Sequence, residues 1–176
     1  MSLIPNSVTE RPDSGFPPVA RIDARILVLG SLPSRRSLEA GEYYAHPRNT
    51  FWPIMAELAG AGGSYNERCG TLIDQRVALW DVLAEAPRPG SLDADIQTAA
   101  AAPNDFCAFF GKHRQIVRIG FNGQTAARLF EKLVPTECRA MIAEYRILPS
   151  TSPAYAAMPY AAKLSAWREF LDLQAE

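Results

Sequence analysis

The sequence of 176 residues has few of the side chains that most enzymes use for metal binding or nucleophilic catalysis. It contains three cysteines and two histidines. Cys69, Cys107 and Cys138 are odd in number and widely spaced, so they form no metal-binding pair, and we expect reduced thiols in a packed fold. His46 has no second ligand at a helical spacing, and His113 is expected at a helix end. The sequence therefore predicts no metal site and no cofactor.

Long apolar runs and a strong net charge are also absent. No run approaches the roughly 18 apolar residues of a membrane span, and residues 1–20 lack the pattern of a signal peptide, so we expect a cytoplasmic protein without membrane association. The formal net charge is -1. Overall charge thus gives no support for nucleic-acid binding, and any such function depends on local clusters of basic side chains.

Short apolar runs alternate with helical patterns along the chain. Strands are predicted at 24–29, 77–83, 116–121 and 145–148, and helices at 51–58, 105–110 (capped by Asn104), 124–133 and 161–173. This alternation predicts an α/β fold, a three-layer α/β/α sandwich with a central parallel sheet of about four strands. We expect residues 21–176 to form this single domain and the proline-containing residues 1–20 to form a flexible N-terminal arm.

Polar and aromatic side chains follow the ends of the predicted strands. The loops after parallel strands meet at one edge of an open sheet, where ligands bind. Residues 30–49, the chain from Asp81 onward, residues 122–123 and residues 150–155 are expected to converge there. The first of these loops carries the paired aromatics Tyr43 and Tyr44 and the amide of Asn49, which together are typical of a pocket for a flat ring.

Two common kinds of site find little support in these loops. Ser31 and Ser34 follow a strand, but neither lies in the G-x-S-x-G turn of a serine hydrolase. Residues 30–34 lack the glycine content and the lysine of a P-loop, although their backbone amides can contact one phosphate. What remains is a site of tyrosines, amides, serines and one carboxylate, without metal, nucleophilic cysteine or histidine base.

Four motifs occur in order: G-S-L-P-S at 30–34, Y-Y-A-H-P-R-N-T-F-W at 43–52, L-W-D-V-L at 79–83 and P-S-T-S-P-A at 149–154. Together they resemble those of the hypoxanthine-DNA glycosylases, or DNA-deoxyinosine glycosylases, of the uracil-DNA glycosylase superfamily. The second motif is also similar to that of the mismatch-specific uracil glycosylases. The likeness runs from about residue 25 to 170 and implies a uracil-DNA glycosylase-like fold and a monofunctional enzyme of base excision repair.

The resemblance implies a role for each pocket residue. Such enzymes flip a nucleotide out of the duplex, read its base and let water attack the sugar carbon. Tyr44 would stack on the base, Asn49 would be catalytic, and Ser31, Asp81 and Ser150 would contact the base. An ionised Asp81 only accepts hydrogen bonds, so it would pair with hypoxanthine N1–H or uracil N3–H and oppose adenine N1. The alternatives are loop packing for Tyr44, a helix N-cap for Asn49, and a helix cap or salt bridge for Asp81.

Further residues around the pocket are expected to contact DNA. They are Pro33, Ser34, Arg35, Arg36, Arg48, Asn122, Gly123, Ser152, Pro153, Ala154 and Tyr155. The three arginines either neutralise phosphates or form a solvated face. The chain at 152–154 lies where the superfamily inserts a wedge into the minor groove. Tyr155 stands where family members often have Asn, which leaves its role open.

Two positions depart from the pattern of several uracil glycosylases. Leu32 stands where those enzymes hold the water with Asp or Asn, and Ser150 stands where their second motif begins with His or Asn. Excision of uracil should therefore be modest or absent, and the expected substrate is double- or single-stranded DNA with hypoxanthine as the deaminated base. The alternatives are a mismatch-type uracil or xanthine glycosylase and a non-catalytic nucleic-acid-binding module on the same fold. A monomer is expected.

Overall fold

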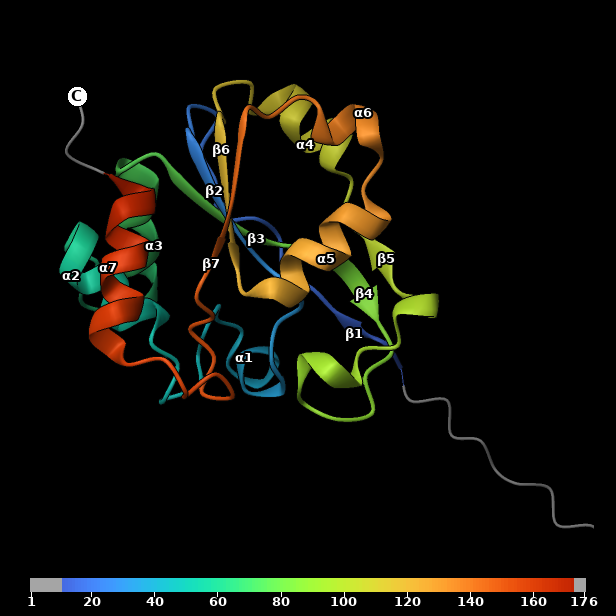
Figure 1. Ribbon diagram of the computed structural model, residues 1–176, viewed down its shortest axis with the longest axis horizontal. Helices are drawn as coiled ribbons and strands as arrows, with labels where there is room; N and C mark the ends of the chain where they lie inside the picture. Colours follow the sequence, from blue (N-terminus) through green and yellow to red (C-terminus); the bar gives the residue numbers. More distant parts are fainter. Residues whose placement is uncertain (1–10, 173–176) are drawn as a thin grey trace, which may run out of the picture.

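A four-stranded parallel sheet forms the centre of the computed structural model, which describes residues 11–172 (Figure 1). Its strands are β2 (Ile26–Gly30), β3 (Val77–Asp81), β6 (Arg118–Asn122) and β7 (Glu144–Leu148). They lie in the order β3-β2-β6-β7, and every neighbouring pair is parallel. The predicted central sheet is therefore confirmed.

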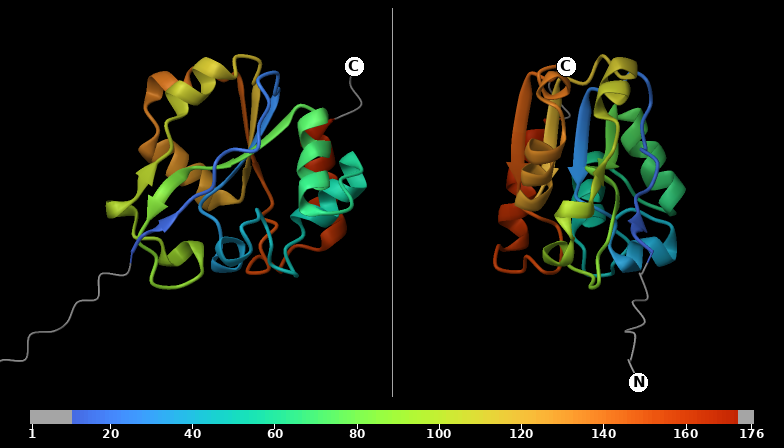
Figure 2. Two further views of the ribbon diagram at one scale, coloured as in Figure 1. Left: turned by 180° about the vertical axis from the view of Figure 1, so that it is seen from behind. Right: turned by 90° about the vertical axis from the view of Figure 1, so that its right-hand side faces the viewer.

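Helices cover both faces of this sheet. One layer contains α2 (Phe51–Ala59), α3 (Tyr65–Asp74) and α7 (Tyr160–Leu171), and the other contains α4 (Phe106–Lys112), α5 (Gln124–Leu133) and α6 (Thr136–Arg139). The left view of Figure 2 shows the same three layers from behind. Successive side chains of a strand point to opposite faces. Leu27 and Leu29 accordingly join the cluster under α4–α6, whereas Ile26 and Val28 join the cluster under α2, α3 and α7.

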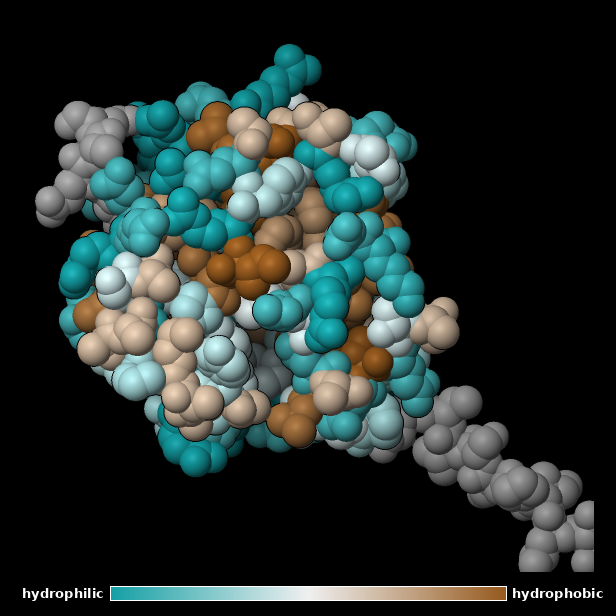
Figure 3. Space-filling model, viewed as in Figure 1, coloured by the Kyte–Doolittle hydropathy of each residue, from teal (hydrophilic) through white to brown (hydrophobic). Residues whose placement is uncertain are grey.

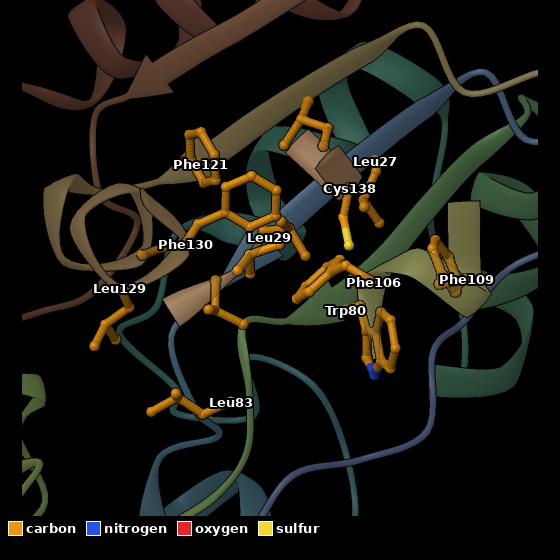
Figure 4. Close-up of a cluster of buried hydrophobic side chains, with 14 of the residues drawn as sticks. Leu27, Leu29, Trp80, Leu83, Phe106, Phe109, Phe121, Leu129, Phe130 and Cys138 are labelled. Atoms are coloured by element: carbon orange, nitrogen blue, oxygen red, sulfur yellow. The ribbon is translucent and has the colours of Figure 1, made fainter. Parts of the chain in front are cut away.

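The cluster on the α4–α6 side is rich in aromatic rings (Figure 4). The Phe106 ring lies 5.1 Å from that of Trp80 and 5.0 Å from that of Phe130. At its edge Cys107 of α4 and Cys138 of α6 form a disulfide. The expectation that all three cysteines are reduced is therefore wrong for this pair, because two thiols distant in sequence meet where α4 packs on α6. Cys69 is a free, buried thiol.

A small antiparallel sheet lies beside the parallel one. It has the order β1-β4-β5, formed by β1 (Asp13–Ser14), β4 (Leu83–Ala86) and β5 (Ala102–Pro103). The predicted strand at 77–83 is thus divided, because the chain leaves the parallel sheet after Asp81. Residues 11–20, expected to be flexible, pair with the domain through β1 and through a bridge between Val19 and Leu79. Residues 1–10 of the expected arm lie outside the described residues.

Side-chain caps begin two of the helices that the pattern of apolar residues missed. Ser34 accepts a hydrogen bond from the Ser37 N–H and begins α1 (Arg35–Ala40), and α3 begins with a capping box. Asp105, and not Asn104, caps α4 by accepting from the Ala108 N–H. The Asn104 amide instead donates to the backbone oxygen of Asp81 at 2.8 Å, so it supports the end of β3.

Candidate functional site

The carboxyl ends of the parallel strands open into a cavity of about 680 Å³. This size is within the roughly 300–1,000 Å³ of small-ligand sites. A hollow is visible in the lower half of the face shown in Figure 3, at this end of the sheet. The cavity is lined by twelve of the predicted residues, namely Ser31, Pro33, Ser34, Tyr44, Asn49, Asp81, Asn122, Gly123, Ser150, Ser152, Ala154 and Tyr155. The predicted Arg35, Arg36, Arg48 and Pro153 do not line it.

Tyr44 is held in an unusual backbone conformation at the cavity wall. Its φ of 56° lies in the left-handed region, which a tyrosine rarely adopts. The ring stacks on Phe51 with centroids 4.0 Å apart. Its hydroxyl is buried and has no hydrogen-bond partner within residues 11–172. Burial, with the charge of Asp81 second, raises the pKa of this hydroxyl, so it stays a neutral donor. The Tyr44 ring therefore packs against Phe51 and also lines the cavity.

Asn49 presents one end of its amide to the cavity and uses the other to begin α2. Its Oδ1 accepts a hydrogen bond from the Phe51 N–H at 2.9 Å, which makes an Asx turn just before the N-cap residue Thr50. The adjoining Thr50 donates from its backbone to the Thr151 oxygen at 3.0 Å, which ties this loop to the loop after β7. Because Oδ1 is engaged, the orientation of the amide is fixed and Nδ2 is its free end. In the described part of the chain this Nδ2 has no partner.

Asp81 lies at the end of β3, 3% exposed, with Oδ2 lacking any hydrogen-bond partner in the described residues. A Cβ atom at position 30 would collide with Asp81 Oδ1 and lie 3.3 Å from the Tyr44 hydroxyl. Gly30 is therefore what lets these two groups approach the loop after β2. The side chain of Asp81 makes neither a helix cap nor a salt bridge among residues 11–172, so neither alternative is observed. A buried, unpartnered oxygen in a cavity is available to a ligand.

Burial raises the pKa of Asp81 from 3.8 to about 8, with the negative charge of Asp93 adding to the shift and Arg88 opposing it. The neutral acid therefore predominates at pH 7 in the free protein. This differs from the ionised carboxylate assumed from the sequence, because the sequence does not show how deeply the side chain is buried. A neutral carboxylic acid both donates and accepts hydrogen bonds.

We expect the free energy of unfolding to fall as pH rises from about 4 to about 8, relative to the Asp81→Asn variant. The unfolded chain releases the Asp81 proton near 3.8, whereas the folded protein keeps it up to about 8. Between these values the folded state binds more protons, so raising the pH favours unfolding. The pKa of Asp93 is raised too, but both proteins contain Asp93, so its contribution cancels in the comparison. Urea denaturation of both proteins across this window checks the slope, and parallel curves would contradict it.

A cavity residue that the sequence did not reveal is Asp93, in the short 3-10 turn η1 (Asp93–Asp95). Its Oδ1 accepts a hydrogen bond from the Ser31 hydroxyl at 2.6 Å. In the sequence S-L-D-A-D this acid resembles an ordinary solvated turn. No local signal distinguishes it, because its position depends on a contact with a residue 62 positions away.

Two arginines hold the loop that carries Asp93. Arg35 donates to the backbone oxygens of Gly90 at 2.9 Å and Arg88 at 2.8 Å. Arg88, 4% exposed, donates to Asp13 at 2.9 Å and to the Pro33 oxygen at 2.6 Å. These bonds join the loop to the chain after β2 and to β1. The guanidinium of Arg35 is thus engaged inside the protein, which leaves it fewer donors for the phosphate contact predicted for it.

The remaining predicted arginines lie on the surface outside the cavity. Arg36 forms an exposed ion pair with Glu39, with 3.5 Å between Nη1 and Oε2. Arg48 is exposed, and its guanidinium has no partner in the described range. Both are placed where a charged ligand in solution can reach them.

The loop after β7 is fixed by Asn122 and Thr151. Asn122 Nδ2 donates to the Thr151 hydroxyl at 2.8 Å, and Asn122 Oδ1 accepts from the Thr151 N–H at 2.9 Å. Gly123, with φ of 97°, allows close contact with Ser150. Further along, the backbone oxygen of Tyr155 accepts from Lys163 of α7 at 2.6 Å. Thr151, 1% exposed, was not predicted, and its role is to position the loop.

Residues 11–172 contain no cluster of three side chains suited to a metal ion. Over the same range, no helix has the length and apolar character needed to cross a membrane.

Comparisons with known proteins point to one group. The sequence model of the Uracil DNA glycosylase superfamily matches residues 17–171. The chain is 36% identical to a protein of Methanosarcina acetivorans named Hypoxanthine DNA glycosylase and 33% identical to a protein of the same name from Methanosarcina barkeri. Each match covers 80% of this chain and 86% of the relative.

A solved structure agrees with these matches. A Methanosarcina acetivorans protein, studied by solution NMR as a candidate uracil DNA glycosylase, superposes with a TM-score of 0.78 at 32% identity. The similarity covers 93% of this chain and 99% of that one.

Proposed function

Since this chain belongs to the uracil DNA glycosylase superfamily, we propose that it is a monofunctional DNA glycosylase that releases hypoxanthine from deaminated adenine in base excision repair. Two relatives named Hypoxanthine DNA glycosylase, at 33% and 36% identity, support the substrate. The observation in the structure that carries the proposal is the buried, unpartnered oxygen of Asp81 in a cavity shared with Tyr44 and Asn49. A flipped base needs a stacking ring and a polar partner of this kind.

Recognition of the base follows from the hydrogen bonds that Asp81 can make. Hypoxanthine has a donor at N1–H beside an acceptor at O6. A neutral Asp81 accepts from N1–H with one oxygen and donates to O6 with the other, whereas the ionised form keeps only the bond to N1–H. Adenine has an acceptor at N1, which the ionised form opposes but the neutral form tolerates. Rejection of adenine by Asp81 is therefore sharpest above its pKa of about 8.

Asn49 acts at the scissile bond between N9 of the base and C1′ of the sugar. This bond breaks as a water oxygen bonds to C1′, and the departing base carries the electron pair. The free Nδ2 of Asn49 can donate to that water or to the developing charge on the base, and its Oδ1 is held by Phe51. An amide cannot serve as a strong base, so its contribution is orientation and electrostatic stabilisation.

The test of this function measures base release from duplexes that contain inosine, uracil or xanthine. Each duplex is incubated with the protein, and alkali then cleaves the strand at the abasic sites. We expect inosine to be processed fastest and uracil weakly, since Leu32 is apolar and buried and Ser150 is a weak substitute for His or Asn. A duplex with adenine at the same position is the control. Fastest release of uracil or xanthine would favour the mismatch-type alternative. Binding without release of any base would favour a non-catalytic module.

If Arg36 and Arg48 contact phosphates, both should contribute to the fall of DNA affinity with added salt. Each cation that neutralises a phosphate contributes roughly one unit to the slope of log affinity against log salt. The Arg36→Ala, Arg48→Ala double variant should therefore lose about two units of slope. Titrations of labelled inosine duplex over a range of salt concentrations measure it. Arg114→Ala, at the far end of α4, is the matched control, and an unchanged slope in the double variant would assign both arginines to a solvated face.

A further inference from the structure

The proposed reaction needs a group that takes a proton from the attacking water. Leu32, Asn49 and Asp81 do not provide one. Leu32 is apolar and 5% exposed. The Oδ1 of Asn49 is engaged by the Phe51 N–H, and an amide is a poor proton acceptor. Asp81, buried at the end of β3, is neutral up to about pH 8 and is committed to the base in the proposed function.

Asp93 is the other carboxylate of the cavity. One of its oxygens accepts from the Ser31 hydroxyl at 2.6 Å, so the carboxylate is anchored beside the loop that follows β2. Its other oxygen makes no hydrogen bond with residues 11–172. Asp93 is exposed as well as lining the cavity, so water reaches it. This combination of an anchored oxygen and a free oxygen is what a water-holding carboxylate requires.

The turn that carries Asp93 is supported from three directions. Arg35 holds the backbone at residues 88 and 90, and Arg88 joins the same loop to Asp13 and to Pro33. Asp95 closes the turn by accepting from the Leu92 N–H at 3.1 Å. A general base must be held in place by surrounding contacts to act efficiently, and this loop has such contacts.

We propose that Asp93 is a catalytic residue that holds the attacking water and accepts its proton, an assignment that rests on the proposed glycosylase function. The water oxygen forms a bond to C1′ as the bond from C1′ to N9 breaks, and the electron pair leaves with the base. One water proton passes to the Asp93 carboxylate, which becomes neutral. The released hypoxanthine anion then takes up a proton from solvent, and Asp93 returns its proton to solvent. The products are hypoxanthine and an abasic sugar with a hydroxyl at C1′.

The charged and titratable groups around Asp93 favour this role. Asp81 from β3 and Tyr44 interact with its charge, and Arg88 of its own loop stabilises that charge. Partial withdrawal from water raises the pKa of Asp93, against the opposing effects of Ser31 and Arg88. The carboxylate is therefore a stronger base than an ordinary surface aspartate.

The test compares Asp93→Asn with Glu85→Gln in single-turnover release from an inosine duplex. Both changes remove one negative charge, but Glu85 is exposed on β4, outside the cavity. Loss of a general base should slow release by roughly 100- to 10,000-fold in Asp93→Asn. Its affinity for DNA should stay equal or increase, because a negative charge near the phosphates is removed. Glu85→Gln should release base at the wild-type rate.

A pH profile separates catalysis from support of the loop. The wild-type rate should rise with pH as Asp93 ionises, and Asp93→Asn should lose this rise while its melting temperature is unchanged. Both proteins keep Asp81, so its titration is common to the two profiles. A wild-type rate in Asp93→Asn, or a joint loss of release, affinity and melting temperature, would overturn the assignment. If the wild-type protein released no base at all, the proposed function itself would fail instead.

Discussion

Asn49→Ala is expected to slow single-turnover release of hypoxanthine by roughly 100- to 1,000-fold, the effect of removing one well-placed donor from a site of developing charge. The reason is that Nδ2 of Asn49 is the free end of an amide whose orientation is fixed by the Phe51 N–H. Affinity for inosine-containing DNA should change little, because most of that affinity comes from the phosphate backbone. Rapid-mixing assays with excess protein give the rate, and titrations at fixed salt give the affinity.

The same variant also loses the hydrogen bond to the Phe51 N–H at the start of α2, worth about 1 kcal/mol. Asn49→Asp is the control for this loss, because it keeps an oxygen for the Phe51 N–H while it replaces the amide donors by a carboxylate oxygen and adds a negative charge. We expect this variant to melt near the wild-type temperature and to be nearly as slow as Asn49→Ala. Full activity in Asn49→Asp would show that Nδ2 is not required. Equal losses of affinity and release in Asn49→Ala would leave capping as the function of this residue.

Above about pH 8, where Asp81 is ionised, Asp81→Asn is expected to reduce the preference for a base with N1–H over one with an acceptor at N1. The reduction should be roughly ten- to a hundredfold, the effect of about 1–3 kcal/mol for each mismatched buried polar group. An amide can turn either its oxygen or its NH2 towards N1, whereas ionised Asp81 offers only acceptors. A suitable pair of substrates is inosine and the nucleoside of unsubstituted purine, which has an acceptor at N1 and nothing at C6.

The pH dependence of this preference provides a second criterion. In the wild-type protein the ratio of the two rates should increase as pH passes about 8, because Asp81 then becomes ionised. In Asp81→Asn the ratio should be independent of pH over this range. A parallel fall of both rates together with the melting temperature would show that Asp81 supports the fold and does not read the base.

The centre of the sheet could be predicted from the sequence because β2 and β3 are buried on both faces. Uninterrupted apolar runs such as that ending at Leu29 then differ clearly from amphipathic helices such as α5. The small sheet of β1, β4 and β5 could not be predicted in this way. Its strands are two to four residues long, and their pairing depends on segments distant in the sequence.

The site was predictable where its residues stand in motifs at the ends of parallel strands, and twelve of the predicted residues do line one cavity. Two of its features are not contained in any motif. The position of Asp93 depends on a hydrogen bond to Ser31, and the neutral state of Asp81 depends on burial by several loops together. The roles of these residues in base release stay predictions that the variants above test.

The ion pair between Arg88 and Asp13 limits how far the N-terminus can be truncated without loss of stability. The sequence suggests trimming at residue 20, where the expected arm ends. Such a truncation would remove Asp13 and leave Arg88, 4% exposed, as a buried cation without its carboxylate. Loss of one partner of a buried pair costs roughly 3–5 kcal/mol. Because Arg88 also holds the loop of Asp93, a segment that does not itself line the cavity sets the minimal length of a competent protein.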